Sequence, residues 1–146
     1  MNYKQLIDWF KECARQLDGQ VRFECDWAQE MNEVKDGELP MSYPYIHLTP
    51  PQWRRGIKSL GKQYSIVMYF VDKSREDGMS TKRDFAEVIS DLQDMAENYM
   101  ANLFNYSNQS DKYGEPVLME TQTPEFTPDE GTTNNGDYYI MARFNV

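Results

Sequence analysis

Apolar residues recur every three or four positions in two stretches of the chain. The first stretch, residues 2–18, ends just before Gly19, and glycine commonly terminates helices. Its apolar positions are Tyr3, Leu6, Ile7, Phe10, Cys13, Ala14 and Leu17. The second stretch runs from about residue 81 to residue 104, with apolar positions Phe85, Val88, Ile89, Leu92, Met95, Ala96, Tyr99 and Leu103. This spacing predicts two amphipathic helices, and Ser80 or Thr81 can cap the second one.

Shorter stretches carry the apolar patterns of β-strands. Residues 21–27 alternate strictly, which places one face of the strand in the core and the other outside it. Residues 62–72 are apolar on both faces at their centre, so we expect a central strand that is covered on both sides. Residues 43–48, 116–121 and 138–144 are further strand candidates.

The segments between these elements are rich in residues that interrupt regular structure. Residues 28–42 are polar, and residues 49–56 contain two consecutive prolines, so both are predicted as loops within an elaborated region at about 28–60. Residues 123–137 hold two prolines and an Asn-Gly pair, and they are predicted as a second long loop.

The order of these elements indicates an α+β fold in a single domain, residues 1–146. We expect a mostly antiparallel or mixed sheet with the two amphipathic helices packed on it. The one connection that could form a parallel crossover leads from strand 62–72 through the second helix to strand 116–121.

Charge and composition narrow the function classes. The formal net charge is −9, and an acidic domain gains no counterion release from a polyanion, so general nucleic-acid binding is not expected. Aromatic residues make up 14% of the chain, a composition that suits interaction surfaces. The sequence has neither a membrane-spanning apolar run nor the pattern of a signal peptide. Cys13 and Cys25 are therefore expected to be buried thiols.

Residues with catalytic chemistry are present but form no recognisable motif. His47, the only histidine, has no nucleophile signature nearby, so we interpret it as a strand residue that makes one hydrogen bond. The sequence shows no zinc spacing and no glycine-rich phosphate loop. Acidic residues at 72–77 and 129–130 do not match a calcium loop, and we interpret them as solvated turns. No enzymatic activity, metal or cofactor is expected.

Two sets of residues are candidates for interaction surfaces. The first is an aromatic and basic set, Trp53, Arg54 and Arg55 together with Tyr43 and Tyr45. Trp and Arg are enriched in interface hot spots, although Trp53 could equally fold back to close the core. The second is an acidic stripe on the second helix, Asp84, Glu87, Asp91 and Asp94. This stripe is either an ordinary solvated face or a wall that repels passing DNA and lets it slide.

The second half of the chain resembles a family of virus assembly proteins. The resemblance rests on Met-Tyr-Phe-Val-Asp-Lys at 68–73, Phe-Ala-Glu-Val-Ile-Ser-Asp-Leu at 85–92 and Thr-Pro-Glu-Phe-Thr-Pro at 123–128. These stretches are similar to tail-completion and head–tail connector (neck ring) proteins of tailed bacteriophages of Bacteroidetes, the crAss-like phages included. The resemblance covers roughly residues 60–146.

This resemblance implies a tail-terminator-like fold and a role as a virion structural protein. Such proteins assemble in the host cytoplasm into a six-fold or twelve-fold ring in the neck of the virion. The implied partners are other copies of the chain, the portal, and other neck or tail proteins. DNA would pass through a central channel without sequence-specific binding, and no membrane is involved. The region at about 28–60 departs from the family pattern, and we interpret it as an elaboration that contacts a neighbouring ring.

Two other function classes remain open from the sequence. The chain could be a small acidic cytosolic binding or inhibitor protein of a phage or mobile element, directed at a basic or DNA-binding target. The third class, a hydrolase that uses carboxylates, is the weakest of the three because the sequence offers acids without a base, a metal cluster or a nucleophile motif.

Overall fold

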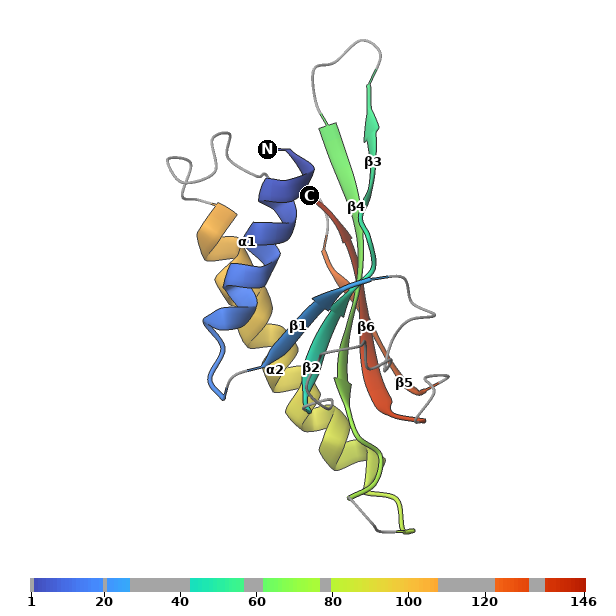
Figure 1. Cartoon of the computed structure of the whole chain (residues 1–146). Coiled ribbons are helices and arrows are strands. Elements are labelled where there is room, and N and C mark those ends of the chain that lie inside the picture. The colour runs from blue at the N-terminus through green and yellow to red at the C-terminus, as the bar shows by residue number, and fades with distance from the viewer. Residues whose placement is uncertain are drawn as a thin grey trace, which may run out of the picture.

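The computed structural model of the chain describes residues 2–19, 21–26, 43–56, 62–76, 80–107, 123–131 and 136–146. These residues form two helices and one six-stranded mixed sheet, so the α+β prediction is confirmed. The elements are α1 (Tyr3–Arg15), β1 (Arg22–Cys25), β2 (Tyr45–Leu48), β3 (Gln52–Arg55), β4 (Lys62–Asp72), α2 (Phe85–Ser107), β5 (Glu125–Glu130) and β6 (Tyr138–Asn145). Figure 1 shows both helices on the same face of the sheet.

Strand β4 is the centre of the sheet, as its doubly apolar pattern predicts. The strand order is β1-β2-β4-β6-β5, and β3 also pairs with β4. All pairs are antiparallel except β1 with β2, so the described sheet has its parallel pair at the β1 edge. The predicted partner of the crossover, residues 116–121, lies outside the described residues, as do residues 28–42.

The prediction of a loop over residues 49–56 was wrong, because β3 lies inside it. Leu48 is opposite Met68, whereas Gln52 is opposite Ser65, so three residues of one strand face two of the other. This is a β-bulge, and it is a place where a sheet accepts proline. The amide of Thr49 still donates to the Val67 carbonyl at 3.0 Å, so the ladder continues across the interruption. The two prolines interrupt the strand without ending its pairing.

The prediction of a long loop over residues 123–137 was also wrong. Residues Glu125–Glu130 form β5, which pairs antiparallel with β6. Pro128 sits within this strand, opposite Ile140. Among the described residues no strand pairs with the other edge of β5, and proline is tolerated at such an edge because no neighbour there needs its missing amide.

Helix α1 begins with a complete capping box. The side chain of Asn2 accepts from the Gln5 amide at 2.9 Å, and the Gln5 side chain accepts from the Asn2 amide at 2.8 Å. Most of the predicted apolar stripe is buried, and Trp9 adds to it, whereas Tyr3 is exposed and Ile7 is partly buried. Gly19 follows at φ 88°, a left-handed conformation that favours glycine.

Helix α2 begins later than the pattern indicated, and its cap is Asp84, neither Ser80 nor Thr81. The Asp84 carboxylate accepts from the Ala86 amide at 2.9 Å and the Glu87 amide at 3.4 Å. Lys82 and Arg83 therefore precede the helix, where carboxylates neutralise their charges. Lys82 pairs with Glu130, and Arg83 pairs with Asp72 at 3.2 Å.

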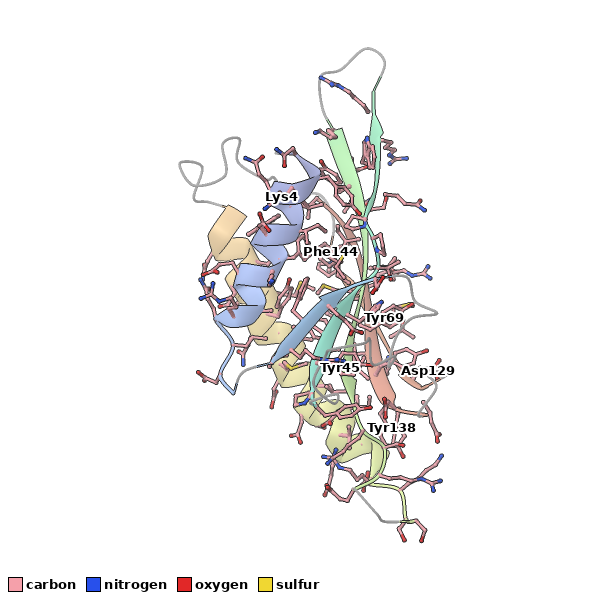
Figure 2. The ribbon with its side chains drawn as sticks, viewed as in Figure 1. Lys4, Tyr45, Tyr69, Asp129, Tyr138 and Phe144 are labelled. Carbon is pink, nitrogen blue, oxygen red and sulfur yellow. The ribbon has the colours of Figure 1, made fainter. Side chains whose placement is uncertain are left out.

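The core lies between the helices and the sheet. Figure 2 shows Phe144 on the side of the sheet that faces the helices, and its ring stacks on Phe10 with centroids 6.1 Å apart. Tyr99 of α2 is fully buried, and its hydroxyl donates to the Phe10 carbonyl at 3.0 Å. This bond ties the two helices together at the centre of the core.

Candidate functional site

Strand β3 and the first residues of β4 form a hairpin that projects beyond the helix-covered part of the sheet (Figure 1). The register of β6 with β4 ends at Ser65, followed by paired hydrogen bonds between Tyr64 and Val146. Beyond that point Lys62 and Gln63 pair with β3. Every residue of β3 is exposed, so the hairpin presents side chains to the surroundings.

Trp53 is the most exposed large apolar side chain of the hairpin. It is 62% exposed and lies across the strands from Tyr64. The ring of Tyr3, at the start of α1, meets the Trp53 ring edge-on with centroids 5.8 Å apart. Trp53 does not close the core. Instead, Tyr3 supports one part of the indole and leaves most of it accessible.

The arginines beside Trp53 give the hairpin a positive charge. Arg54 donates through Nε and a terminal nitrogen to the Gln63 side-chain oxygen, at 2.9 and 2.7 Å. Arg55 stands directly opposite Lys62 in the register. The Lys62 ammonium lies over the Tyr64 ring, 5.6 Å from its centroid, so both strands of the hairpin carry basic side chains.

Tyr43 and Tyr45, predicted as part of the same surface, lie elsewhere. Tyr45 is fully buried on the face away from the helices, where Arg22 lies over its ring at 4.5 Å. Burial raises the pKa of Tyr45 far above its ordinary value, with Glu24 contributing in the same direction. The Tyr43 hydroxyl donates to Asp137 at 2.8 Å. The structure therefore keeps Trp53 and its arginines together and separates the two tyrosines from them.

His47 is buried with both ring nitrogens engaged, where the sequence predicted one hydrogen bond. Its Nδ1 lies 2.6 Å from Glu24 Oε1, and its Nε2 lies 2.9 Å from the Asp26 carbonyl oxygen. The side chain is 0% exposed. A histidine held in this way joins β1 to β2 and presents no nitrogen to a substrate.

The acidic stripe of α2 divides into two parts. Asp84 caps the helix, as described above, whereas Glu87, Asp91 and Asp94 are exposed on the helix itself. Helix α2 also carries Glu97, and it has no lysine or arginine. Every charged side chain of α2 is therefore acidic, beside uncharged exposed residues such as Gln93.

A groove between α2 and β5 was not foreseen from the sequence. It encloses about 240 Å³ and is lined by Ile89, Gln93, Ala96, Glu97, Phe126, Pro128 and Ile140. Phe126 is 42% exposed there. The missed signal was the alternation of Phe126 and Pro128 with polar residues in a segment predicted as a loop. The groove is apolar at its floor and acidic at its border.

The described residues contain no cluster of three or more His, Cys, Asp or Glu side chains that could hold a metal ion. Cys13 is buried, and Cys25 is partly buried; neither is in a disulfide. Burial raises the pKa of Cys25 to about 11, and Asp26 adds to the shift. A reactive thiol has a lowered pKa, so Cys25 has the opposite of a nucleophile's environment.

Two comparisons of the sequence gave no match. The sequence matches no protein-family model, and a search of curated proteins gave no match. Neither described helix is both long and apolar enough to cross a membrane.

Proposed function

We propose that the chain is a virion structural protein that forms a ring in the neck of a tailed phage. The ring would connect the portal and capsid to the tail and let DNA pass through a central channel. The proposal rests on the resemblance of residues 60–146 to neck proteins and includes no catalytic activity, metal or cofactor. Its location would be the virion.

The projecting hairpin is the observation that carries this proposal. A ring of identical subunits needs contacts that reach from one copy to the next. The hairpin holds an exposed Trp and two arginines on a paired strand that extends from the sheet. Trp and Arg presented in this way are typical of interface hot spots.

The acidic face of α2 also fits the proposal. Glu87, Asp91 and Asp94 are exposed along the helix, without a basic residue among them. A wall of this charge facing a channel would repel the DNA backbone and prevent it from sticking. Replacing all three residues with lysine should leave the ring assembled. DNA should then bind to the wall of the channel and be retained there.

The direct test is the mass of the protein in solution, alone and with the portal protein of the same virus, measured by native mass spectrometry. A closed six-fold or twelve-fold ring, alone or on the portal, is the expected result. Detection at a ring copy number in purified virions would add independent support. A chain that stays monomeric and ignores the portal contradicts the proposal.

The acidic surface supports one alternative, a small cytosolic binding or inhibitor protein of a phage or mobile element. A helix whose charged side chains are all carboxylates is complementary to a basic or DNA-binding target. This alternative predicts a monomer that forms a complex with one basic partner and is absent from virions. The two proposals are separated by the same mass measurement and by the protein content of the virion.

A further inference from the structure

The groove between α2 and β5 and the projecting hairpin are chemically complementary. The groove has an apolar floor formed by residues such as Phe126 and Ile140, and Glu97 lies at its border. The hairpin offers an exposed indole with basic side chains next to it. Within the part of the chain that the structure describes, the groove is an apolar hollow and Trp53 is an apolar projection that is 62% exposed.

The charges of the two surfaces are opposite. Among the described residues that line the groove, Glu97 is the one with a charged side chain, and it is acidic. By contrast, the hairpin contains Arg54, Arg55 and Lys62. Neither β3 nor residues 62–71 of β4 include an acidic residue.

The size of the groove favours a side chain over a small ligand. Pockets for small molecules usually measure about 300–1,000 Å³. The groove encloses about 240 Å³ and is open to the surroundings along α2 and β5. This volume suits a large aromatic side chain inserted from another protein, the kind of anchor that dominates interface energetics.

We propose that the hairpin of one copy docks into the α2–β5 groove of a second copy, with Trp53 as the inserted side chain. Arg55, which shares the Trp53 face of β3, would then lie beside Glu97 at the border of the groove. The inference rests on the proposed function in that a ring requires such a contact between copies.

The positions of the two surfaces make this contact head-to-tail. Figure 1 places the β3 hairpin at one end of the sheet and β5 toward the other, on opposite sides of the centre. A hairpin attached to β4 cannot fold back into the groove of its own chain without breaking the sheet. Each copy therefore has one projection and one receiving groove, the two different surfaces that a heterologous ring requires.

The test uses two full-length variants with complementary defects. Trp53→Ser with Arg55→Glu removes the projection and leaves the groove intact, and Phe126→Arg with Glu97→Arg blocks the groove and leaves the hairpin intact. All four side chains are exposed, so the fold should persist, which far-UV circular dichroism checks. Lys11→Glu, a charge reversal on the exposed side of α1, is the matched control.

Self-association is measured by sedimentation velocity over a range of concentrations. We expect each double variant to associate at least about 30-fold more weakly than wild type, because a lost hot-spot Trp weakens binding by that factor or more. An equimolar mixture of the two variants should form one-to-one dimers, because one intact hairpin meets one intact groove and growth then stops. Lys11→Glu should associate like wild type.

Other outcomes overturn the inference without deciding the proposed function. Wild-type association that both variants retain would place the contact elsewhere in the ring. Variants that lose portal binding but keep self-association would assign the hairpin to the portal. A wild-type chain that is monomeric at every concentration refutes docking between copies, and binding to the portal then tests the proposed function separately.

Discussion

Strand β4 passes through two different environments, and the comparison explains how this fold separates stability from recognition. At Ile66, Met68 and Phe70 its side chains face the helices and are at most 1% exposed. At its start, β4 pairs with β3, in which every residue is exposed. Hydrogen bonding is continuous through both regions. What differs is whether a helix lies over the strand, so pairing builds the strand and helix cover decides what its side chains do.

The largest test of this comparison removes one aromatic ring from each region. Phe70→Ala should lower the free energy of unfolding by about 3–5 kcal/mol, because Phe70 is fully buried and its ring packs against Tyr99. Trp53→Ala, at a site that is 62% exposed, should lower it by less than about 1 kcal/mol. Urea unfolding measures both. Equal losses would show that the hairpin belongs to the cooperative core.

The second test concerns Cys25 of β1, which lies on the face of the sheet that the helices cover. Its pKa is raised to about 11 by burial, from an ordinary value of 9.0, so below pH 9 the folded chain contains up to about 100-fold less thiolate than the unfolded chain. Alkylation of Cys25 by iodoacetamide should be slower by up to that factor. Peptide mapping by mass spectrometry measures it, with the chain in guanidinium as control.

The same shift predicts how stability depends on pH. A raised pKa means that the folded state holds the Cys25 proton more tightly than the unfolded state does. The stabilisation that the protonated thiol gives to the folded state is therefore complete below pH 9 and is lost as the pH rises toward about 11. Equal alkylation rates in the folded and unfolded chains would refute the protected environment of this thiol.

A third test concerns the face of the sheet away from the helices. Glu24→Gln should lower the free energy of unfolding by about 1–3 kcal/mol, because it weakens the contact of a buried His47. Asp8→Asn is the matched control, since Asp8 pairs with Lys4 on the surface and such pairs are worth at most about 1 kcal/mol. Thermal unfolding at pH 7 compares the two. A larger loss for Asp8→Asn would contradict the structural role given to His47.

The smallest expected effect comes from a comparison of two residues of the acidic stripe, Asp84 and Asp91. Asp84→Ala should lower the free energy of unfolding by about 1 kcal/mol, because Asp84 caps α2. Asp91→Ala, on the exposed face of the same helix, should change it by less than about 0.5 kcal/mol. Helical content and urea midpoints measure both. If Asp91→Ala costs as much as Asp84→Ala, the exposed carboxylates also have a structural role.

Elements with a strong period could be predicted from the sequence, whereas those that depend on a neighbour could not. The α1 stripe and β4, whose bounds match residues 62–72, followed directly from apolar spacing. Strands β3 and β5 were missed because each contains or follows proline. Proline is excluded from a strand by its missing amide, but a bulge and a free sheet edge remove that requirement, and neither can be recognised before the pairing is known.

The candidate surfaces show the same limit. Trp53, Arg54 and Arg55 lie together and exposed on β3, because adjacent residues stay adjacent in space. Tyr45 was grouped with them by composition, yet it is buried. Phe126 was not considered, because its role depends on α2, far away in the sequence.

By itself the sequence determined the two amphipathic helices, the central strand, the negative charge and the set of aromatic and basic residues near position 53. These properties are local or additive, so spacing and composition are enough to define them. Only the tertiary structure decided that Trp53 projects while Tyr45 is enclosed, that Asp84 caps a helix, and that α2 and β5 leave a groove between them. Each of these depends on which segments lie side by side, and burial and pairing across long sequence separations determine that arrangement.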